Sequence, residues 1–174
     1  MKQHLLILVF FAIATLNRKS YLDAIILNQA QLVSWYPTYK NESQLFLDHK
    51  EISSIAADAF QGGLVSLKYL TLDFNFLTSL DSTTFNSLPN LERLSIASNQ
   101  LNRIDTAVIF NSLFNLKILN LSWNQLTSFD RNSFVSLINL EKVYLGSNPI
   151  SYLQPLFILK LCSAQSNPKC TIYL

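Results

Sequence analysis

Histidine and cysteine, which most often supply nucleophiles, bases and zinc ligands, are few and far apart in this sequence. The 174 residues include two histidines, His4 and His49, and two cysteines, Cys162 and Cys170. A nucleophile–base pair or a zinc site needs such side chains within reach of one another, and His49 lies far along the chain from both cysteines. No GxSxG, P-loop, HExxH or Rossmann glycine pattern occurs. The sequence therefore predicts no catalytic residue, no cofactor and no enzymatic activity.

Two carboxylates, Asp48 and Asp73, are the remaining candidates for chemistry. They occupy equivalent places in consecutive segments of the repeat described below, which would stack them on neighbouring strands about 5 Å apart. Such a pair could bind calcium or repel mildly in water. Calcium takes six or more oxygen ligands, and no further oxygens are expected to converge there. We therefore expect no metal site.

Modification sites favour an oxidising, secretory environment. Asn41 and Asn120 each begin an Asn-x-Ser tripeptide that fits the N-glycosylation acceptor. Cys162 and Cys170 are an even pair at short spacing, which in a secreted chain is most simply a disulfide. In a reducing compartment the same two residues would be idle thiols.

The first twenty residues have the features of a secretory signal. Lys2 gives a positive start, an apolar run covers residues 5–16, and Ala12-Ile13-Ala14 offers the small-x-small pattern of a cleavage site. We expect a signal peptide over residues 1–20, with cleavage after Ala14, and a secreted, extracellular protein; an uncleaved anchor is the alternative. The run is shorter than the roughly 20 apolar residues of a membrane span, so no membrane insertion is expected.

The charge balance bears on the kind of partner. There are 13 basic and 11 acidic residues, a net charge of +2, and they form no basic stripe with interleaved aromatics of the kind that nucleic-acid binders show. Such a chain has no strong field to attract nucleic acid or an anionic membrane. We therefore expect no nucleic-acid partner.

One pattern recurs four times along the chain, in segments that begin at Leu67, Leu91, Leu116 and Leu140. Each segment has apolar residues at places one, four, six, eleven and fourteen, and asparagine at place nine. These asparagines are Asn75, Asn99, Asn124 and Asn148. A divergent fifth segment begins at Glu42 and has Lys50 in place of the asparagine. A further set of recurring residues comprises Phe60, Phe85, Phe110 and Phe134.

Each recurring place has a physical reason. Alternating apolar and polar residues around places three to seven predict a strand with one face in the core. The asparagine amide both donates and accepts, so it can satisfy backbone groups where the chain turns. The phenylalanines would fill the opposite side. One segment buries too little apolar surface to offset its chain entropy, so stability must come from contacts between neighbours.

The pattern LxxLxLxxNxL resembles the leucine-rich repeat signature, and the version with a late Phe is similar to that of extracellular members. These include Toll-like receptor ectodomains, Slit-type guidance proteins and small leucine-rich proteoglycans. The resemblance implies an α/β-type repeat solenoid, a horseshoe with a concave parallel β-sheet and a mostly irregular or short helical convex side. It divides the chain into an irregular N-terminal cap (21–41), about five repeats with the first divergent (42–161) and a reduced C-terminal cap (162–174).

The resemblance also implies that partners bind the concave sheet, at the variable places between the leucines. The candidate contact residues are Phe46, Tyr69, Phe74, Arg93, Trp123 and Tyr144. Exposed aromatic residues beside arginine are typical of interface hot spots. Phe74 and Trp123, at place eight, either contact a partner or fold over the repeat edge as packing. A glycan on Asn120 would cover the centre of this face, whereas an unmodified Asn120 is an ordinary polar contact.

The leading interpretation is a secreted recognition module that binds a protein or glycan partner in immunity, adhesion or signalling. A second is an extracellular-matrix structural protein, although the N-terminal cysteine cluster and Ser-Gly sites of the small proteoglycans are missing here. A third is an incomplete fragment of a transmembrane leucine-rich repeat receptor. The sequence leaves the ligand and the oligomeric state open.

Overall fold

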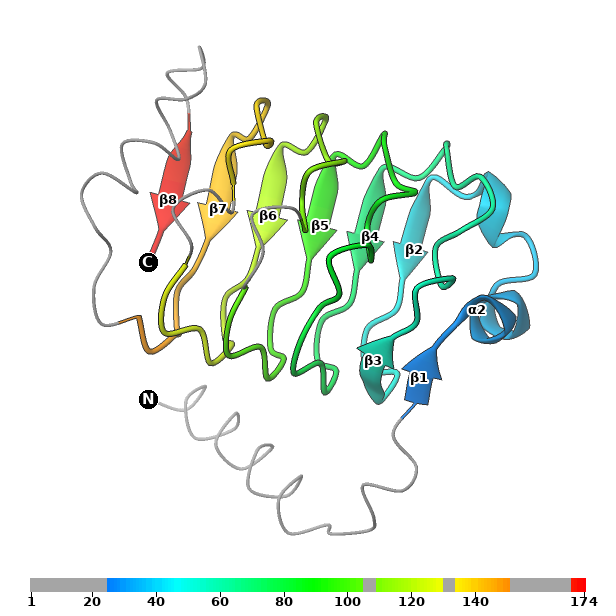
Figure 1. The fold of residues 1–174 in the computed structure, drawn as a ribbon, viewed down its shortest axis with the longest axis horizontal. Coiled ribbons are helices and arrows are strands. Elements are labelled where there is room, and N and C mark those ends of the chain that lie inside the picture. Colours follow the sequence, from blue (N-terminus) through cyan, green and yellow to red (C-terminus); the bar gives the residue numbers. More distant parts are fainter. Residues whose placement is uncertain (1–24, 105–108, 130–133, 151–169) are drawn as a thin grey trace, which may run out of the picture.

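A six-stranded parallel sheet forms the spine of the computed structural model, which describes residues 25–104, 109–129, 134–150 and 170–174. In spatial order the strands are β2 (Gln44–Phe46), β4 (Tyr69–Thr71), β5 (Arg93–Ser95), β6 (Ile118–Asn120), β7 (Lys142–Tyr144) and β8 (Thr171–Tyr173). Every neighbouring pair is parallel, and Figure 1 shows the strands side by side with one direction. Each of the first five strands begins a new turn of the chain, so the sheet grows by one strand per repeat.

The strands align the fourth place of every repeat. Leu70 pairs with Leu94, and Leu119 pairs with Val143. The side chains at this place are all buried in the first five strands, at Leu45, Leu70, Leu94, Leu119 and Val143. The repeats therefore share one continuous hydrophobic core, because matching leucines stack on each other instead of forming separate clusters.

Behind the sheet, a column of phenylalanine rings fills the space between the layers. Phe60, Phe85, Phe110 and Phe134 stack in order, with centroid distances of 6.4, 6.2 and 5.8 Å. Apart from β3 (Ile52–Ile55), which pairs with β1 (Ile25–Leu27), and a bridge between Ile104 and Phe129, this side is irregular in the described residues. The expected repeat solenoid with a parallel sheet and an irregular convex side is confirmed.

The asparagines at place nine join each repeat to the one before it. Asn99 is fully buried, and its Nδ2 donates to the carbonyl of Leu72 in the preceding repeat (2.9 Å) and to that of Ala97 in its own turn (3.1 Å). Its Oδ1 accepts from the backbone N–H of Leu77 (3.0 Å). The same pair of bonds to the preceding repeat recurs at Asn75, Asn124 and Asn148. The predicted ladder is thus a set of bonds between repeats.

This direction of bonding explains Lys50, the divergent residue of the first repeat. Each asparagine reaches back to an earlier repeat, and among the described residues β2 is the first strand of the sheet. An asparagine at position 50 would therefore have no earlier described strand of this sheet to bond. Instead, the backbone N–H of Lys50 donates to Oδ1 of Asn75 (3.0 Å). The Lys50 ammonium lies 5.4 Å from the centroid of the Trp35 ring, an attractive cation–π distance.

The described part of the N-terminal cap contains regular elements where the sequence suggested an irregular segment. After β1, Asn28 accepts from the N–H of Gln31 (2.8 Å) and caps α2 (Gln29–Trp35), as an N-cap asparagine does. The 3-10 helix η1 (Tyr39–Asn41) follows. The Tyr36 hydroxyl donates to the carbonyl of Phe46 (2.6 Å), so the cap satisfies part of the outer edge of β2.

The last residues form a strand that the sequence pattern did not predict. Residues 162–174 were expected to be a reduced cap, yet β8 pairs in parallel with β7 and places Ile172 beside Val143. The signal segment 1–20 and Cys162 lie outside the described residues, so the signal peptide and the disulfide stay predictions. Within the described residues, no helix is both long and apolar enough to cross a membrane.

We predict that Asn99→Ala lowers the free energy of unfolding by about 3 kcal/mol, because it leaves the Leu72 carbonyl and the Leu77 N–H buried without partners. Asn115→Ala is the control, since Asn115 is an exposed asparagine with one backbone bond, to Pro89 (3.0 Å). That change should cost no more than about 1 kcal/mol. Chemical denaturation monitored by circular dichroism measures both. Equal losses would show that the ladder contributes nothing beyond an exposed hydrogen bond.

Candidate functional site

Two rows of side chains alternate with the buried leucines and form the outer face of the sheet. We call this surface the concave face. It consists of place three (Gln44, Tyr69, Arg93, Ile118, Lys142 and Thr171) and place five (Phe46, Thr71, Ser95, Asn120, Tyr144 and Tyr173). Because successive side chains of a strand point to opposite faces, these rows are the part of the sheet that can vary without disturbing the core.

Four of the predicted contact residues lie on the concave face. Phe46 ends β2 and is 52% exposed. The guanidinium of Arg93 lies 5.6 Å from the ring centroid of its neighbour Tyr69, so an aromatic and a cation are held together on adjacent strands. Tyr144 ends β7 and is partly buried. These positions are those that strand alternation predicts.

Tyr173 adds an aromatic residue that the sequence pattern missed. Its ring stacks on that of Tyr144, with centroids 4.4 Å apart and planes at 10°, and it remains 42% exposed. Since Tyr173 follows the equivalent residue of the previous repeat by more than the usual interval, the repeat spacing gave no sign of it. The signal that could have predicted this strand is its sequence, Thr-Ile-Tyr, because all three residue types are common in β-strands.

Phe74 and Trp123 lie in the turns after the strands, not on the strands. Both have left-handed backbone conformations (φ 56° and 58°), and so do His49, Ser98 and Ser147 at the same place of other repeats. Phe74 stacks on His49 with centroids 4.5 Å apart and stays 49% exposed. Place eight is therefore a row of turn residues at the edge of the concave face, in which Phe74 both packs locally and meets solvent.

Asp48 and Asp73 are hydrogen-bonded parts of the scaffold. Asp48 accepts from the N–H of Asp73 (2.8 Å) and the hydroxyl of Thr71 (2.8 Å). Asp73 repeats the arrangement one strand further on, accepting from the N–H of Ala97 (2.6 Å) and the hydroxyl of Ser95 (2.7 Å). Within the described part of the chain, no group of three or more His, Cys, Asp or Glu side chains could hold a metal ion.

Burial raises the pKa of the Asp73 carboxyl above its ordinary value, and the nearby Asp48 charge adds to that effect. The hydrogen bonds from Ser95 and Ala97 act in the opposite direction, because they stabilise the carboxylate. Burial has the larger effect. Asp73 is therefore a partly buried carboxyl whose hydrogen bonds join two repeats.

The two glycosylation candidates occupy different environments. Asn41 ends η1 and is exposed. Asn120 ends β6 in the middle of the concave face, where its Oδ1 accepts from the Ser122 hydroxyl (2.6 Å) and N–H (3.1 Å). A glycan on Asn41 would leave the concave face open, and one on Asn120 would cover it.

Comparison with known proteins gives a family model and solved structures that match this chain. The family model described as leucine rich repeat matches residues 43–101, 65–111 and 94–150. Among solved structures, the crystal structure of a TLR13–ssRNA13 complex matches with a TM-score of 0.60 and 25% sequence identity. The match covers 79% of this chain and 22% of that chain, so this chain spans about a fifth of that relative. No curated protein sequence matches.

We predict that Asp73→Asn changes the pH dependence of stability in a defined direction. Because the folded-state pKa of Asp73 is raised, the favourable contribution of this group to the free energy of unfolding is fully present below its unfolded-state pKa of about 4. That contribution is lost as the pH rises through the folded-state pKa. Asparagine keeps an oxygen acceptor without a charge. The free energy of unfolding of the wild type, relative to that of the variant, should therefore fall as the pH rises from about 3 through the folded-state pKa of Asp73. Denaturation series at several pH values test this, and a rise instead of a fall would contradict it.

Proposed function

Because the chain belongs to the leucine-rich repeat family, we propose that it is a non-enzymatic recognition module that binds a protein or glycan ligand through its concave face. One observation carries the proposal. The concave face presents aromatic and basic side chains to solvent, while the leucines and asparagines behind it complete the scaffold among themselves. Interface cores are enriched in tyrosine, other aromatic residues and arginine. The similarity to a receptor complex supports a ligand-binding role.

The charges on this face favour a ligand with acidic groups. At places three and five of the described strands, the charged residues are Arg93 and Lys142, both basic. The nearby carboxylates of Asp48 and Asp73 are engaged in hydrogen bonds between repeats. A ligand surface that carries carboxylates and apolar groups therefore complements the concave face best.

A second candidate ligand is single-stranded RNA, because the solved relative is a complex of TLR13 with ssRNA13. The expectation of no nucleic-acid partner rested on the small net charge of +2 and the lack of a basic stripe. Arg93 beside Tyr69 offers one cation and one ring for base stacking, but it is a single such pair. We therefore place RNA after protein and glycan, and keep it as an arm of the binding experiment.

We further propose that the protein is secreted and acts outside the cell in immunity, adhesion or signalling. The signal-like first twenty residues, the two sequons and the cysteine pair support secretion. Cys162 and Cys170 would then form a disulfide. A matrix structural protein and a fragment of a larger receptor are the alternatives, and the solved relative is much longer than the present chain.

Affinity capture from extracellular fluid tests the concave face. The triple variant Phe46→Ala/Arg93→Ala/Tyr144→Ala removes side chains from three different strands and should bind the captured ligand at least about ten-fold more weakly. The matched control is Val33→Ala/Phe76→Ala, which removes two exposed apolar side chains outside the concave face (47% and 40% exposed) and should bind like the wild type.

Circular dichroism checks that both variants fold. Capture that is equal for the wild type and the triple variant would remove the concave face as the binding surface. A ligand lost on nuclease treatment would replace the protein or glycan proposal by the RNA candidate.

Mass spectrometry of glycopeptides tests a consequence of the same proposal. A concave face that binds a ligand requires an unmodified Asn120, whereas Asn41 can carry a glycan. We therefore expect glycosylation at Asn41 and none at Asn120 in protein secreted from animal cells. Full occupancy of Asn120 would contradict binding through the centre of this face.

A further inference from the structure

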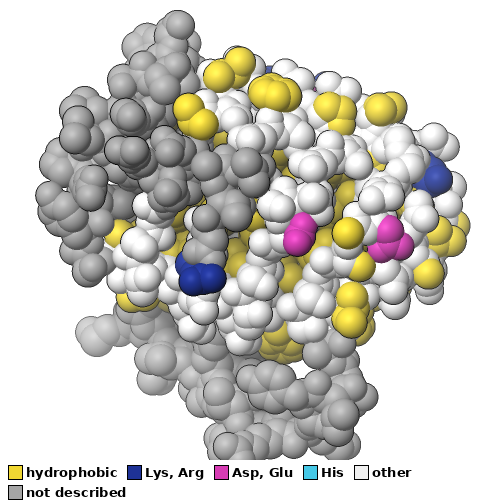
Figure 2. Space-filling model, viewed as in Figure 1, with side chains coloured by type: hydrophobic (Ala, Val, Ile, Leu, Met, Phe, Trp, Pro, Cys, Tyr) yellow, Lys and Arg dark blue, Asp and Glu magenta, His cyan; other side chains and the backbone are white. Residues whose placement is uncertain are grey.

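A second surface lies at the edge of the sheet where the strands begin. The segments that lead into β4, β5, β6 and β7 place three rows of side chains there, and we call this surface the start rim. Its rows are charged (Lys68, Glu92, Lys117, Glu141), amide (Asn90, Asn115, Asn139) and apolar (Val65, Pro89, Phe114, Ile138). In the view of Figure 2 the strands begin at the top of the molecule, and apolar side chains are seen along that edge. No predicted contact residue belongs to the start rim.

The apolar row is exposed although its members recur with the period of the core. Val65, Phe114 and Ile138 are 59%, 52% and 53% exposed, and Pro89 is exposed as well. Each stands two residues before the first, buried leucine of its repeat. Scattered apolar residues on a surface need no explanation, but exposed apolar residues at the same place of four consecutive repeats are a candidate interaction site.

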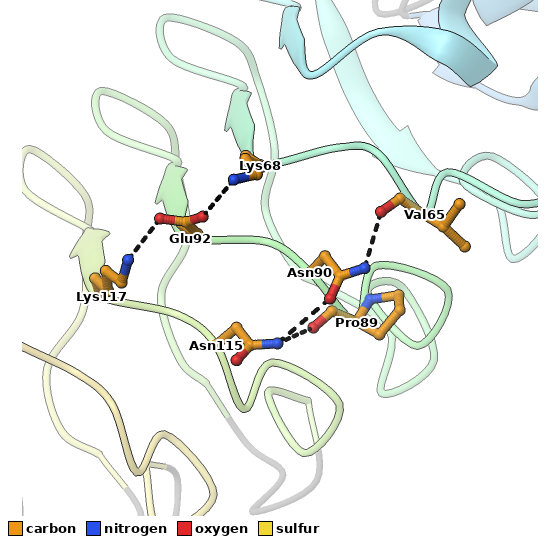
Figure 3. A network of polar contacts seen from close by, with 7 residues as sticks. All are labelled: Val65, Lys68, Pro89, Asn90, Glu92, Asn115 and Lys117. Carbon is orange, nitrogen blue, oxygen red and sulfur yellow. Dashed lines mark hydrogen bonds and ion pairs between the residues drawn. The ribbon is translucent and has the colours of Figure 1, made fainter.

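The amide row holds the apolar row in place. Asn90 donates to the carbonyl of Val65 (2.9 Å), and Asn115 donates to that of Pro89 (3.0 Å), as Figure 3 shows. Asn139 donates in the same way to the carbonyl of Phe114 (2.7 Å). Each amide thus fixes the backbone of an apolar residue in the preceding repeat, so the start rim is ordered before any partner arrives, which lowers the entropic cost of binding.

The charged row alternates in sign from one repeat to the next. Glu92 forms ion pairs with Lys68 (3.0 Å) and Lys117 (2.7 Å) on its two sides, and these lysines lower the pKa of the Glu92 carboxyl. Glu141, at the end of the row, makes no ion pair with any described residue. A groove of about 500 Å³ follows the charged and amide rows. The charges along this row are positive, negative, positive and negative in order, so the net charge of the row is zero.

We propose that the start rim binds the start rim of a second copy of this chain, with the two solenoids antiparallel. A two-fold axis that crosses the rows between the repeats of Glu92 and Lys117 reverses the order of the repeats and leaves each row facing its own kind. Reversing an alternating row exchanges its signs, so Lys68 faces Glu141 of the second copy and Glu92 faces Lys117. Isologous contacts of this kind are the usual basis of homodimers.

The apolar row pairs under the same operation. Val65 meets Ile138 of the second copy, and Pro89 meets Phe114, so the most exposed apolar side chains of the start rim leave water together. A parallel alignment would instead set lysine against lysine and glutamate against glutamate, which is unfavourable. The charge pattern thus selects one orientation. The contact covers four repeats, and it leaves the concave face of each copy open.

Sedimentation equilibrium of the full secreted chain without added ligand tests the proposal. Between low micromolar and about one millimolar protein, we expect a reversible monomer–dimer equilibrium. Lys68→Glu and Glu141→Lys should each weaken the dimer about ten-fold, because each places two like-charge pairs in the interface. The double variant Lys68→Glu/Glu141→Lys restores opposite charges and should dimerise within about two-fold of the wild type.

Phe114→Ser tests the apolar row and should also weaken the dimer about ten-fold. Its control is Phe76→Ser, an exposed phenylalanine outside the start rim, which should leave the equilibrium unchanged. Thermal melts verify folding for all variants. A chain that stays monomeric throughout, or a dimer unaffected by the start-rim variants, would overturn the proposal. Weakening that the double variant fails to restore would overturn the antiparallel arrangement. None of these outcomes depends on ligand binding at the concave face.

Discussion

Neighbouring repeats in this protein depend on each other for hydrogen-bond partners of their backbones. The side chain of Asn99 satisfies a carbonyl and an N–H of the preceding repeat, and Asp48 accepts from the N–H of the repeat that follows it. Buried backbone groups without partners are costly, so a single repeat cannot stand alone. Most of this structural work falls on the asparagines, leucines and aspartates, with Thr71 and Ser95 as partners of the aspartates. The other side chains at places three and five are therefore available for recognition.

The sequence predicted the features that the repeat period controls. Leucines at fixed intervals had to stack, since a parallel sheet with one strand per turn brings equal places together, and the phenylalanine column followed for the same reason. The sequence did not predict the elements at either end of the stack of repeats. Strand β8 begins after an interval longer than the repeat, and α2 has one buried residue, Leu32, in seven, so neither produces a periodic signal.

The candidate sites were predicted less completely, because backbone conformation and hydrogen bonds decide them. Alternation placed Phe46, Tyr69 and Arg93 on the concave face, but no pattern reveals that place eight adopts a left-handed turn, which moves Phe74 and Trp123 off the strands. The sequence predicted no metal site at Asp48 and Asp73, but it did not predict that their oxygens accept hydrogen bonds from the next repeat. The apolar row of the start rim recurs with the same period as the buried leucines of the core. Its members, such as Phe114, differ from those leucines only in that their side chains are exposed.

The backward reach of the asparagines gives the stack a polarity. The first repeat carries Lys50 at this place, and among the described residues no earlier strand of the sheet precedes β2. The repeat of Asn148 could not lose its asparagine in the same way, because Asn148 bonds the carbonyl of Leu121 and the N–H of Leu126 in the preceding repeat. Loss of the turn that carries Asn148 would leave the Leu121 carbonyl and the Leu126 N–H without these partners, so unravelling from that end carries an added free-energy cost.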